Sequence, residues 1–327
     1  MRIGIYGFGS IGRLVAKEAL KRGWEISGAV DINEAIIGKD IGDLLGLDSS
    51  YGVEVSNDPS VLFESDVVIH ATGSYLDQVY DQILTIIGMG LDVVSTCETL
   101  AYPYYRYPVL ARIIDAEALK NDVTVIATGI NPGFLLDTLA ITMAMPVNIV
   151  KKITATRVID AGKRRASFRK KVGIGLDPDE FKRLLEKRIL TGHVGYAESV
   201  LLIADALGIH LEKVVEGQEP VVAKKEITYE DRTLPKGTTI GISGYGIGYH
   251  RGEEAIRVEF HAYLGAEEYE EITINGTEYS IKWKSSGTPG DLATASIILN
   301  IASIIDEIMP GLRTMSDIIP FKPFYKR

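Results

Sequence analysis

A glycine-rich turn near the start of the chain constrains the fold more than any other segment. The run Gly7-Phe8-Gly9-Ser10-Ile11-Gly12 follows an apolar strand predicted at residues 2–6 and precedes an amphipathic helix predicted to end near residue 22. A second predicted strand, residues 25–30, ends on Asp31. A glycine turn in this position, with an acidic residue at the end of the next strand, is typical of dinucleotide-binding sites. The sequence therefore predicts a Rossmann-type unit.

Each part of this turn has an expected role. Gly7 permits a tight turn, Gly9 lets the backbone approach a pyrophosphate, and Gly12 lets the helix pack against the strand. The helix N-terminus, with Phe8, Ser10 and Ile11 around it, is expected to hold the phosphates. Asp31 would accept hydrogen bonds from the adenosine ribose and repel a 2′-phosphate, and no arginine stands at residues 32–34. These features predict NAD as the cofactor, with NADP possible.

Strands and helices alternate through the first part of the chain. Further strands are predicted at residues 66–72, 91–95 and 123–127, and helices at 76–89 and 109–120. This order predicts an α/β fold with a doubly wound parallel sheet and right-handed crossovers. Ligands bind at the carboxyl ends of such strands, so Thr72, Gly73 and Ser74 are expected to border the cofactor. A helix cap at Ser74 is the alternative.

The pattern changes after residue 146. A strand is predicted at residues 149–159, helices lie within 179–208, and long strands rich in Val, Ile, Tyr and Thr follow over 212–284. Gly-containing turns separate these strands. The sequence therefore predicts a second α+β domain with an open, largely antiparallel sheet, which suggests a homodimer.

The last helix is expected to return to the first domain, since the small second domain offers it little to cover. Thr288 suits its N-cap and Pro289 its first turn, and the helix is predicted to reach about Met309. The predicted division is an NAD(P)-binding Rossmann domain at residues 1–130, completed by the helix and tail at 288–327. Residues 131–287 form the predicted substrate-binding and oligomerisation domain.

Composition narrows the classes of partner. A net charge of −9 argues against nucleic acid, which needs a concentrated basic face. A single cysteine, Cys97, excludes a disulfide framework, and no spaced ligand cluster predicts a metal site. The start has no leader-like segment and apolar runs are short, so a cytoplasmic protein without membrane segments is expected. The one basic run, residues 163–171, is expected to be a solvated strand or loop, or a seat for a small anion.

The acid–base candidate is Glu98. It follows the strand at residues 91–95 and therefore faces the same edge of the sheet as the cofactor. The aromatic stretch at 102–107, which contains Tyr102 and Tyr104, would favour the protonated form of a nearby carboxylate. A protein group that can change protonation near neutrality suits acid–base catalysis. A structural helix cap is the alternative.

Three further residues are candidates for ligand contact. Asn131, within the turn at residues 128–134, would hydrogen-bond the nicotinamide carboxamide, or else the segment is a plain turn. His193 precedes a helix that runs to Leu207 and either reaches a pocket or caps that helix. His261, on an alternating strand, is expected to point into the same space. Without nucleophile-elbow or Walker motifs, hydride transfer on a nicotinamide is the expected chemistry.

Several dispersed segments together carry a family resemblance. They are Gly7–Arg13, Gly28-Ala29-Val30-Asp31, Gly129–Phe134, Asp160-Ala161-x-Lys163-Arg164-Arg165, Gly192-His193-Val194-Gly195, Gly290–Ala295 and Pro310-Gly311-Leu312-x-Thr314-Met315. The chain resembles the dihydrodipicolinate reductase-like superfamily, and more closely its 2,4-diaminopentanoate dehydrogenase and native amine dehydrogenase branch. The paired histidines and Asp-Ala-Pro-Ser-Gly loop of dihydrodipicolinate reductases proper do not occur in this sequence.

The resemblance implies reversible oxidative deamination of an amine to a ketone with release of ammonia. Glu98 matches the glutamate that serves the amine and water steps in that branch. Arg157, Arg164 and Arg165 would bind the carboxylate of an amino-acid substrate. A pocket without such an anchor would accept simple amines instead. Two alternatives stay open: an imine or carbonyl reductase without ammonia chemistry, and a non-catalytic NAD-sensing protein.

Overall fold

The described chain forms two compact units. The computed structural model describes residues 1–230 and 232–319. The first unit contains Met1–Phe134 and Pro289–Ile319, and the second contains Leu135–Thr288. The last part of the predicted tail, residues 320–327, lies outside the described residues. The chain therefore passes between the units after residue 134 and again after residue 288.

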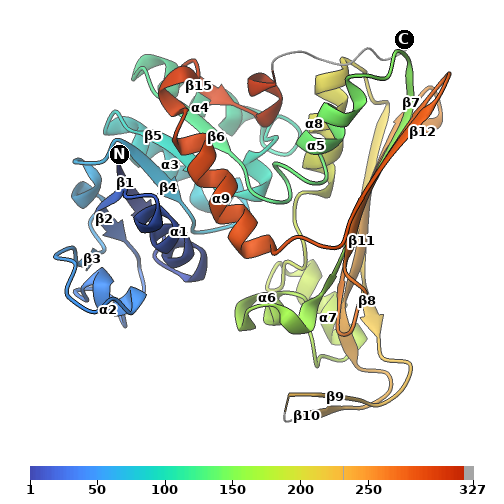
Figure 1. Cartoon of the computed structure of the whole chain (residues 1–327), viewed down its shortest axis with the longest axis horizontal. Coiled ribbons are helices and arrows are strands. Elements are labelled where there is room, and N and C mark those ends of the chain that lie inside the picture. The colour runs from blue at the N-terminus through green and yellow to red at the C-terminus, as the bar shows by residue number, and fades with distance from the viewer. Residues whose placement is uncertain (231, 320–327) are drawn as a thin grey trace. The chain divides into compact units, whose positions relative to one another are not determined.

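A parallel sheet forms the centre of the first unit (Figure 1). Among the described residues it has seven strands in the order β15-β6-β5-β4-β1-β2-β3. All neighbouring strands run parallel, so the predicted doubly wound sheet is confirmed. The strands are β1 (Arg2–Tyr6), β2 (Glu25–Val30), β3 (Val55–Ser56), β4 (Val67–His70), β5 (Asp92–Ser95), β6 (Thr124–Ala127) and β15 (Gly311–Arg313). The order reverses between β1 and β4, which is where such sheets bind ligands.

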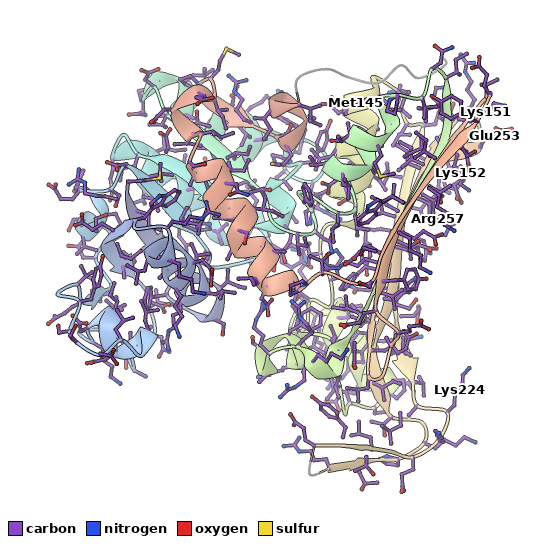
Figure 2. The ribbon with its side chains drawn as sticks, in the orientation of Figure 1. Met145, Lys151, Lys152, Lys224, Glu253 and Arg257 are labelled. Carbon is purple, nitrogen blue, oxygen red and sulfur yellow. The ribbon has the colours of Figure 1, made fainter. Side chains whose placement is uncertain are left out.

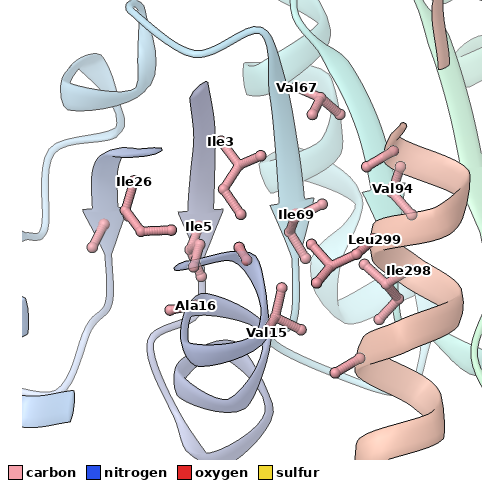
Figure 3. Close-up of a cluster of buried hydrophobic side chains, with 14 of the residues drawn as sticks. Ile3, Ile5, Val15, Ala16, Ile26, Val67, Ile69, Val94, Ile298 and Leu299 are labelled. Carbon is pink, nitrogen blue, oxygen red and sulfur yellow. The ribbon is translucent and has the colours of Figure 1, made fainter. Parts of the chain in front are cut away.

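Helices cover this sheet through apolar faces. Those of the first unit are α1 (Ser10–Lys21), α2 (Ile41–Leu45), α3 (Leu76–Gly88), α4 (Pro108–Lys120) and α9 (Gly290–Ala302), with short 3₁₀ turns η1 (Pro59–Leu62), η2 (Glu98–Leu100), η4 (Ile305–Glu307) and η5 (Met315–Ile318). Ile298 and Leu299 of α9 are fully buried in one cluster with Ile5 and Val15 (Figure 3). The core of the first unit therefore includes a helix that follows the second unit in the chain.

The predicted bounds of this last helix are wrong. It begins at Gly290 with Pro289 in the N-cap position and ends at Ala302, well before Met309. Thr288 does not cap it. The backbone N–H of Thr288 donates to Glu270 at 3.0 Å, and its carbonyl accepts from Arg157 at 2.9 Å. These bonds hold Thr288 in the second unit, and the helix starts only after it.

A second sheet forms the centre of the second unit. Among the described residues it has six strands in the order β14-β13-β7-β12-β11-β8. Only β7 and β12 pair in parallel, which confirms the predicted open, largely antiparallel sheet. The strands are β7 (Val150–Asp160), β8 (Lys213–Val222), β11 (Thr239–His250), β12 (Glu253–Tyr263), β13 (Tyr269–Gly276) and β14 (Ser280–Ser285), with a separate pair β9 (Ile227–Tyr229) and β10 (Arg232–Leu234).

Helix α8 packs closely against this sheet. The helices of this unit are α5 (Thr138–Ala144), α6 (Ala166–Lys171), α7 (Pro178–Glu186) and α8 (Tyr196–Leu207), with the 3₁₀ turn η3 (Ala161–Lys163). A Cβ on Gly246 of β11 would lie 2.8 Å from the carbonyl oxygen of Tyr196. The glycine therefore permits the approach of the helix backbone.

The basic run at residues 163–171 is not the strand or loop that the sequence predicts. It instead forms the end of η3 and the helix α6. The Arg169 side chain donates to the carbonyl of Arg164 at 2.7 Å and so ties the start of this run to the helix. Within the described chain, no helix combines the length and apolar character needed to cross a membrane.

Candidate functional site

The glycine turn has the shape that a pyrophosphate requires. Gly7 has a φ of +99°, and a Cβ there would lie 2.6 Å from the carbonyl oxygen of Ala71. A Cβ on Gly12 would lie 2.0 Å from the carbonyl oxygen of Gly7. These two positions require glycine because a side chain there would collide with the protein's own backbone. A Cβ on Gly9, in contrast, would meet no described atom within 4 Å, so this backbone opens onto free space.

The start of α1 is also suited to an anion. Gly9 is its N-cap, and no side-chain hydrogen bond from the described residues caps it. Its first turn contains no acidic residue. The amides of a helix N-terminus carry a partial positive charge that phosphates neutralise. The turn and helix start therefore fit a bound dinucleotide, which would be held by backbone amides.

Asp31 lies half-buried beyond the end of β2. Its Oδ1 accepts a hydrogen bond from the backbone N–H of Asn33 at 2.9 Å, which shapes the turn. Its other oxygen has no hydrogen-bond partner among residues 1–230 and 232–319. The next residue, Ile32, is 84% exposed. A fixed carboxylate with one oxygen available is suited to a ribose diol.

The carboxyl end of β4 contains a closed hydrogen-bond network. His70 is fully buried, with Nδ1 2.8 Å from Ser95 Oγ and Nε2 2.9 Å from Gln82 Oε1. Thr72 Oγ1 donates to Gln82 Oε1 at 2.6 Å. Burial lowers the pKa of His70 to about 4, so its imidazole is neutral. This histidine supports the strand end that presents Thr72.

Thr99 fixes the neighbouring strand end. Its hydroxyl accepts from the backbone N–H of Leu76 at 2.8 Å, and its own backbone N–H donates to the carbonyl of Ser74 at 3.1 Å. The N-cap of α3 is Tyr75, so the alternative of a cap at Ser74 is wrong. A residue outside the helix supplies the hydroxyl instead, which sequence spacing does not reveal.

Glu98 directly precedes Thr99 in the chain. It is half-buried at the first position of η2, three residues after Ser95, the last residue of β5. The neighbouring residues Cys97 and Thr99 are buried, so the backbone at Glu98 is held firmly. Burial raises the pKa of the Cys97 thiol to about 12, which leaves it unreactive. Glu98 is therefore presented by a rigid segment at the carboxyl edge of the sheet.

The aromatic candidates of the first unit follow β5, and the turn candidate Asn131 follows β6. The Tyr102 and Tyr104 rings pack edge to face, with centroids 5.5 Å apart, and Tyr104 is 41% exposed. Asn131 precedes Pro132 through a cis peptide bond after β6. The preceding residue, Ile130, donates its backbone N–H to Thr294 of α9 at 3.3 Å. The last helix thus supports the turn that contains Asn131.

A row of residues crosses the sheet of the second unit. Strand pairing aligns these residues on neighbouring strands from β8 to β14, in the order Gln218, Gly244, Phe260, Arg157, Glu270 and Ser285. Side chains at aligned positions share one face of a sheet. This row therefore places polar and charged groups beside the ring of Phe260 on one face of the sheet.

His193 lies over this row. Its ring centroid is 4.6 Å from that of Phe260 and 4.7 Å from that of Tyr196, which it meets edge to face. Burial by these rings lowers the pKa of His193 well below its ordinary value, and the positive charges of Lys171 and Arg157 lower it further. His193 is thus a neutral, half-buried imidazole at neutral pH.

The predicted arginines have different surroundings. Arg157 is 1% exposed, and its Nε lies 3.2 Å from Glu270 Oε1. Its guanidinium therefore already has a carboxylate partner within the protein. Arg164 stacks over the ring of Phe168 at 5.0 Å, and Arg165 donates to Ser167 Oγ at 3.0 Å. These two side chains are half-buried beside α6.

The expectation that His261 shares the space of His193 is wrong. His261 follows Phe260 on β12, and successive strand residues point to opposite faces. Because Phe260 contacts His193, His261 lies on the other face, where its Nδ1 is 2.8 Å from Ser243 Oγ. Its Nε2 lies 3.9 Å from Glu259 Oε2.

Both units resemble known protein families. The family model for the 2,4-diaminopentanoate dehydrogenase C-terminal domain matches residues 134–323, and that for the dihydrodipicolinate reductase N-terminus matches residues 1–96. A 2,4-diaminopentanoate dehydrogenase from Acetoanaerobium sticklandii is 31% identical, with 97% of this chain and 93% of that protein covered. An amine dehydrogenase from Streptomyces virginiae is 25% identical, with 65% and 61% covered. The solved amine dehydrogenase of Mycobacterium smegmatis shares the fold, with a TM-score of 0.85, 21% identity, and coverage of 98% and 97%.

Proposed function

The chain belongs to the 2,4-diaminopentanoate dehydrogenase family. On that premise we propose that it oxidatively deaminates an amine or a 2,4-diaminopentanoate-like diamino acid to the ketone, releases ammonia, and runs in reverse as a reductive amination. The observation that supports this best is Glu98, a carboxylate on a rigid segment of the same sheet whose glycine turn fits a dinucleotide.

Glu98 would act twice in this reaction. A bound nicotinamide supplies the hydride acceptor, and hydride leaves only from a carbon that carries a neutral amine. The carboxylate of Glu98 first takes a proton from the substrate ammonium. Glu98 passes this proton to solvent, and after hydride transfer it takes a proton from the water that adds to the iminium carbon. It returns this proton to the amino nitrogen of the resulting carbinolamine, so that ammonia can leave and the ketone forms. The overall balance is substrate ammonium, NAD(P)⁺ and water to ketone, NAD(P)H, ammonium and one proton released to solvent.

NAD is the proposed cofactor. The free oxygen of Asp31 would accept from a ribose hydroxyl, and its charge would repel a 2′-phosphate. Backbone amides at Gly9 and the start of α1 would hold the pyrophosphate. Thr72, Gly73 and Asn131 stay the further candidates for cofactor contact.

His193 is the proposed second residue of the reaction. As a neutral imidazole it would hydrogen-bond the substrate without repelling its ammonium group. Tyr102, Tyr104, Arg164 and Arg165 stay proposed substrate contacts. Arg157 is a weaker candidate for a carboxylate anchor, because Glu270 balances its charge.

A homodimer is proposed through the face of the second sheet opposite α8. This face carries a network in which Arg257 bonds Glu254 at 2.6 Å and Glu259 at 3.2 Å, while Lys152 pairs with Glu254. Figure 2 labels Lys152 and Arg257 of this network. Tyr245 on the same face is 37% exposed. In a two-fold dimer the same patch faces itself, so a surface with charges of both signs and an exposed tyrosine would suit a second copy of the chain. Light scattering should give twice the chain mass of 35.8 kDa, and a monomer would refute the proposal.

One screen tests the activity. NADH formation should be followed over 2,4-diaminopentanoate, other amino acids and simple amines, with NAD and NADP in parallel. Turnover of at least one amine, and ammonium-dependent NADH consumption with the matching ketone, are expected. Ketone reduction that ignores ammonium would replace the proposal with a carbonyl reductase. NADH binding without any turnover would replace it with a sensing protein.

A further inference from the structure

The side chain of Gln218 fastens the segment that carries His193. Gln218 belongs to β8, at the edge of the second sheet. Its Oε1 accepts from the backbone N–H of His193 at 3.0 Å, and its Nε2 donates to the carbonyl of Thr191 at 3.1 Å. One primary amide therefore bonds both ends of a three-residue segment.

The residue between these two bonds is pressed against the same amide. Gly192 has a φ of +57°, and a Cβ there would lie 2.2 Å from Gln218 Oε1. The backbone N–H of Gly192 donates to the carbonyl of Lys171 at 3.1 Å. The segment is thus held from β8 on one side and from the end of α6 on the other.

Strand β8 also fixes the chain just beyond His193. Glu216, two residues before Gln218 and on the same face of the strand, accepts from the backbone N–H of Ala197 at 3.2 Å. This bond satisfies an amide in the first turn of α8, whose N-cap Gly195 has no side chain to do so. The two β8 side chains together define where the His193 loop ends and α8 begins.

The ring of His193 depends on this placement. Phe260 packs against it on one side and Tyr196 meets it on another, and Gly244 aligns with both Gln218 and Phe260. A Cβ on Gly244 would lie 2.1 Å from the Tyr196 hydroxyl, so that ring has little freedom. A small shift of the His193 backbone would therefore move the imidazole out of its aromatic surroundings.

We propose that Gln218 is a positioning residue: its amide holds the backbone at Thr191 and His193 so that the imidazole is fixed where it meets the substrate. The proposal rests on the proposed function in one respect, namely that His193 contacts the substrate. Only a carboxamide satisfies both bonds, since the segment presents one N–H and one carbonyl. A glutamate would face the Thr191 carbonyl with a second acceptor.

The test compares Q218L with a matched control on the same strand. E219Q alters the neighbouring residue, which points to the other face and pairs with Lys182 at an exposed position. In the full-length protein, the imidazole signals of His193, assigned with H193A, are followed by NMR against pH. Q218L should shift these signals and raise the pKa of His193 toward its ordinary value, because the loosened ring becomes hydrated. E219Q should leave them unchanged.

Kinetics give the second readout. Q218L should raise KM for the amine about tenfold with little change in kcat or in NAD affinity, because the displaced imidazole contributes less to substrate binding. In the H193A background, Q218L should add nothing, because both changes act through one imidazole. Unmoved His193 signals in Q218L, or losses that simply add, would overturn the proposal. If the unaltered protein oxidises no amine, the proposed function fails, while the NMR comparison still decides the role of Gln218.

Discussion

Removing the buried charge of Glu270 should destabilise the second unit strongly. The side chains of Glu270 and Arg157 are each 2% exposed, with 3.2 Å between Glu270 Oε1 and Arg157 Nε. The carboxylate also accepts from Thr288 N at 3.0 Å and from Ser285 Oγ. Loss of one partner of a buried pair typically costs about 3–5 kcal/mol, because the other charge stays in a medium that solvates it poorly. E270L should lower the free energy of unfolding by that amount.

Two companion variants separate charge from shape. E270Q keeps an oxygen that can accept from Thr288, so its loss should be smaller than that of E270L. The double variant R157M/E270L removes both charges and should be more stable than E270L alone. The control is E271Q, the next residue on β13, whose partner Lys282 lies 2.9 Å away at a largely exposed position. Such a surface pair contributes at most about 1 kcal/mol.

Urea unfolding followed by tryptophan fluorescence can isolate this effect. The chain has two tryptophans, Trp24 in the first unit and Trp283 on β14, opposite Ile272 of β13. In a W24F background, the fluorescence reports the sheet that contains Glu270. The reasoning would be refuted if E270L cost no more than E271Q, or if the double variant R157M/E270L were no more stable than E270L.

Three further predictions concern the first unit. E98Q should lower turnover by roughly 10²-fold with NAD affinity unchanged, since it keeps the shape of the side chain and removes the proton acceptor. Steady-state rates and NAD titration check this. Near-normal turnover of E98Q would shift the acid–base role to His193. D31A should weaken NAD binding and reduce the ratio of NAD affinity to NADP affinity, as calorimetric titration with both cofactors would show. A tenfold preference of the unaltered protein for NADP would contradict the reasoning. Because the pKa of His70 is lowered from 6.5 to about 4, the unfolded chain binds a proton in this range that the folded chain does not, so stability should fall as pH drops from 6.5 to 4. Urea unfolding at several pH values should show that the free energy of unfolding of H70Q falls less steeply between pH 6.5 and 4. The same pH dependence in H70Q and the unaltered protein would argue against a buried neutral imidazole.

The parallel sheet could be predicted from the sequence because each of its longer strands carries a local signal. Residues 66–72 are an apolar run of strand length between turn signals, and the glycine turn marks the join of β1 and α1. The strands β3 and β15 have two and three residues, too short for any periodicity. Their places in the sheet come from pairing with β2 and β6.

Other features were missed because they depend on partners that are distant in sequence. The parallel pairing of β7 and β12 aligns Ile153 with Ile256, and no local pattern encodes it. Thr288 resembles an N-cap, but Glu270 and Arg157 take up its backbone groups first. The residue that holds the His193 segment is also distant in sequence, since helix α8 lies between His193 and Gln218. Local sequence indicates which residues carry the chemistry, and long-range contacts decide what holds them.

The return of the chain to the first unit sets an order of events during synthesis on the ribosome. Strand β15 completes the edge of the parallel sheet beside β6, and Ile298 and Leu299 of α9 complete its core. These segments are translated only after the whole of Leu135–Thr288. The nascent nucleotide-binding half therefore emerges first with an unpaired strand edge and uncovered apolar side chains, and becomes whole last. The inserted unit, whose strands are contiguous in the chain, can fold while the earlier half still waits for its final helix.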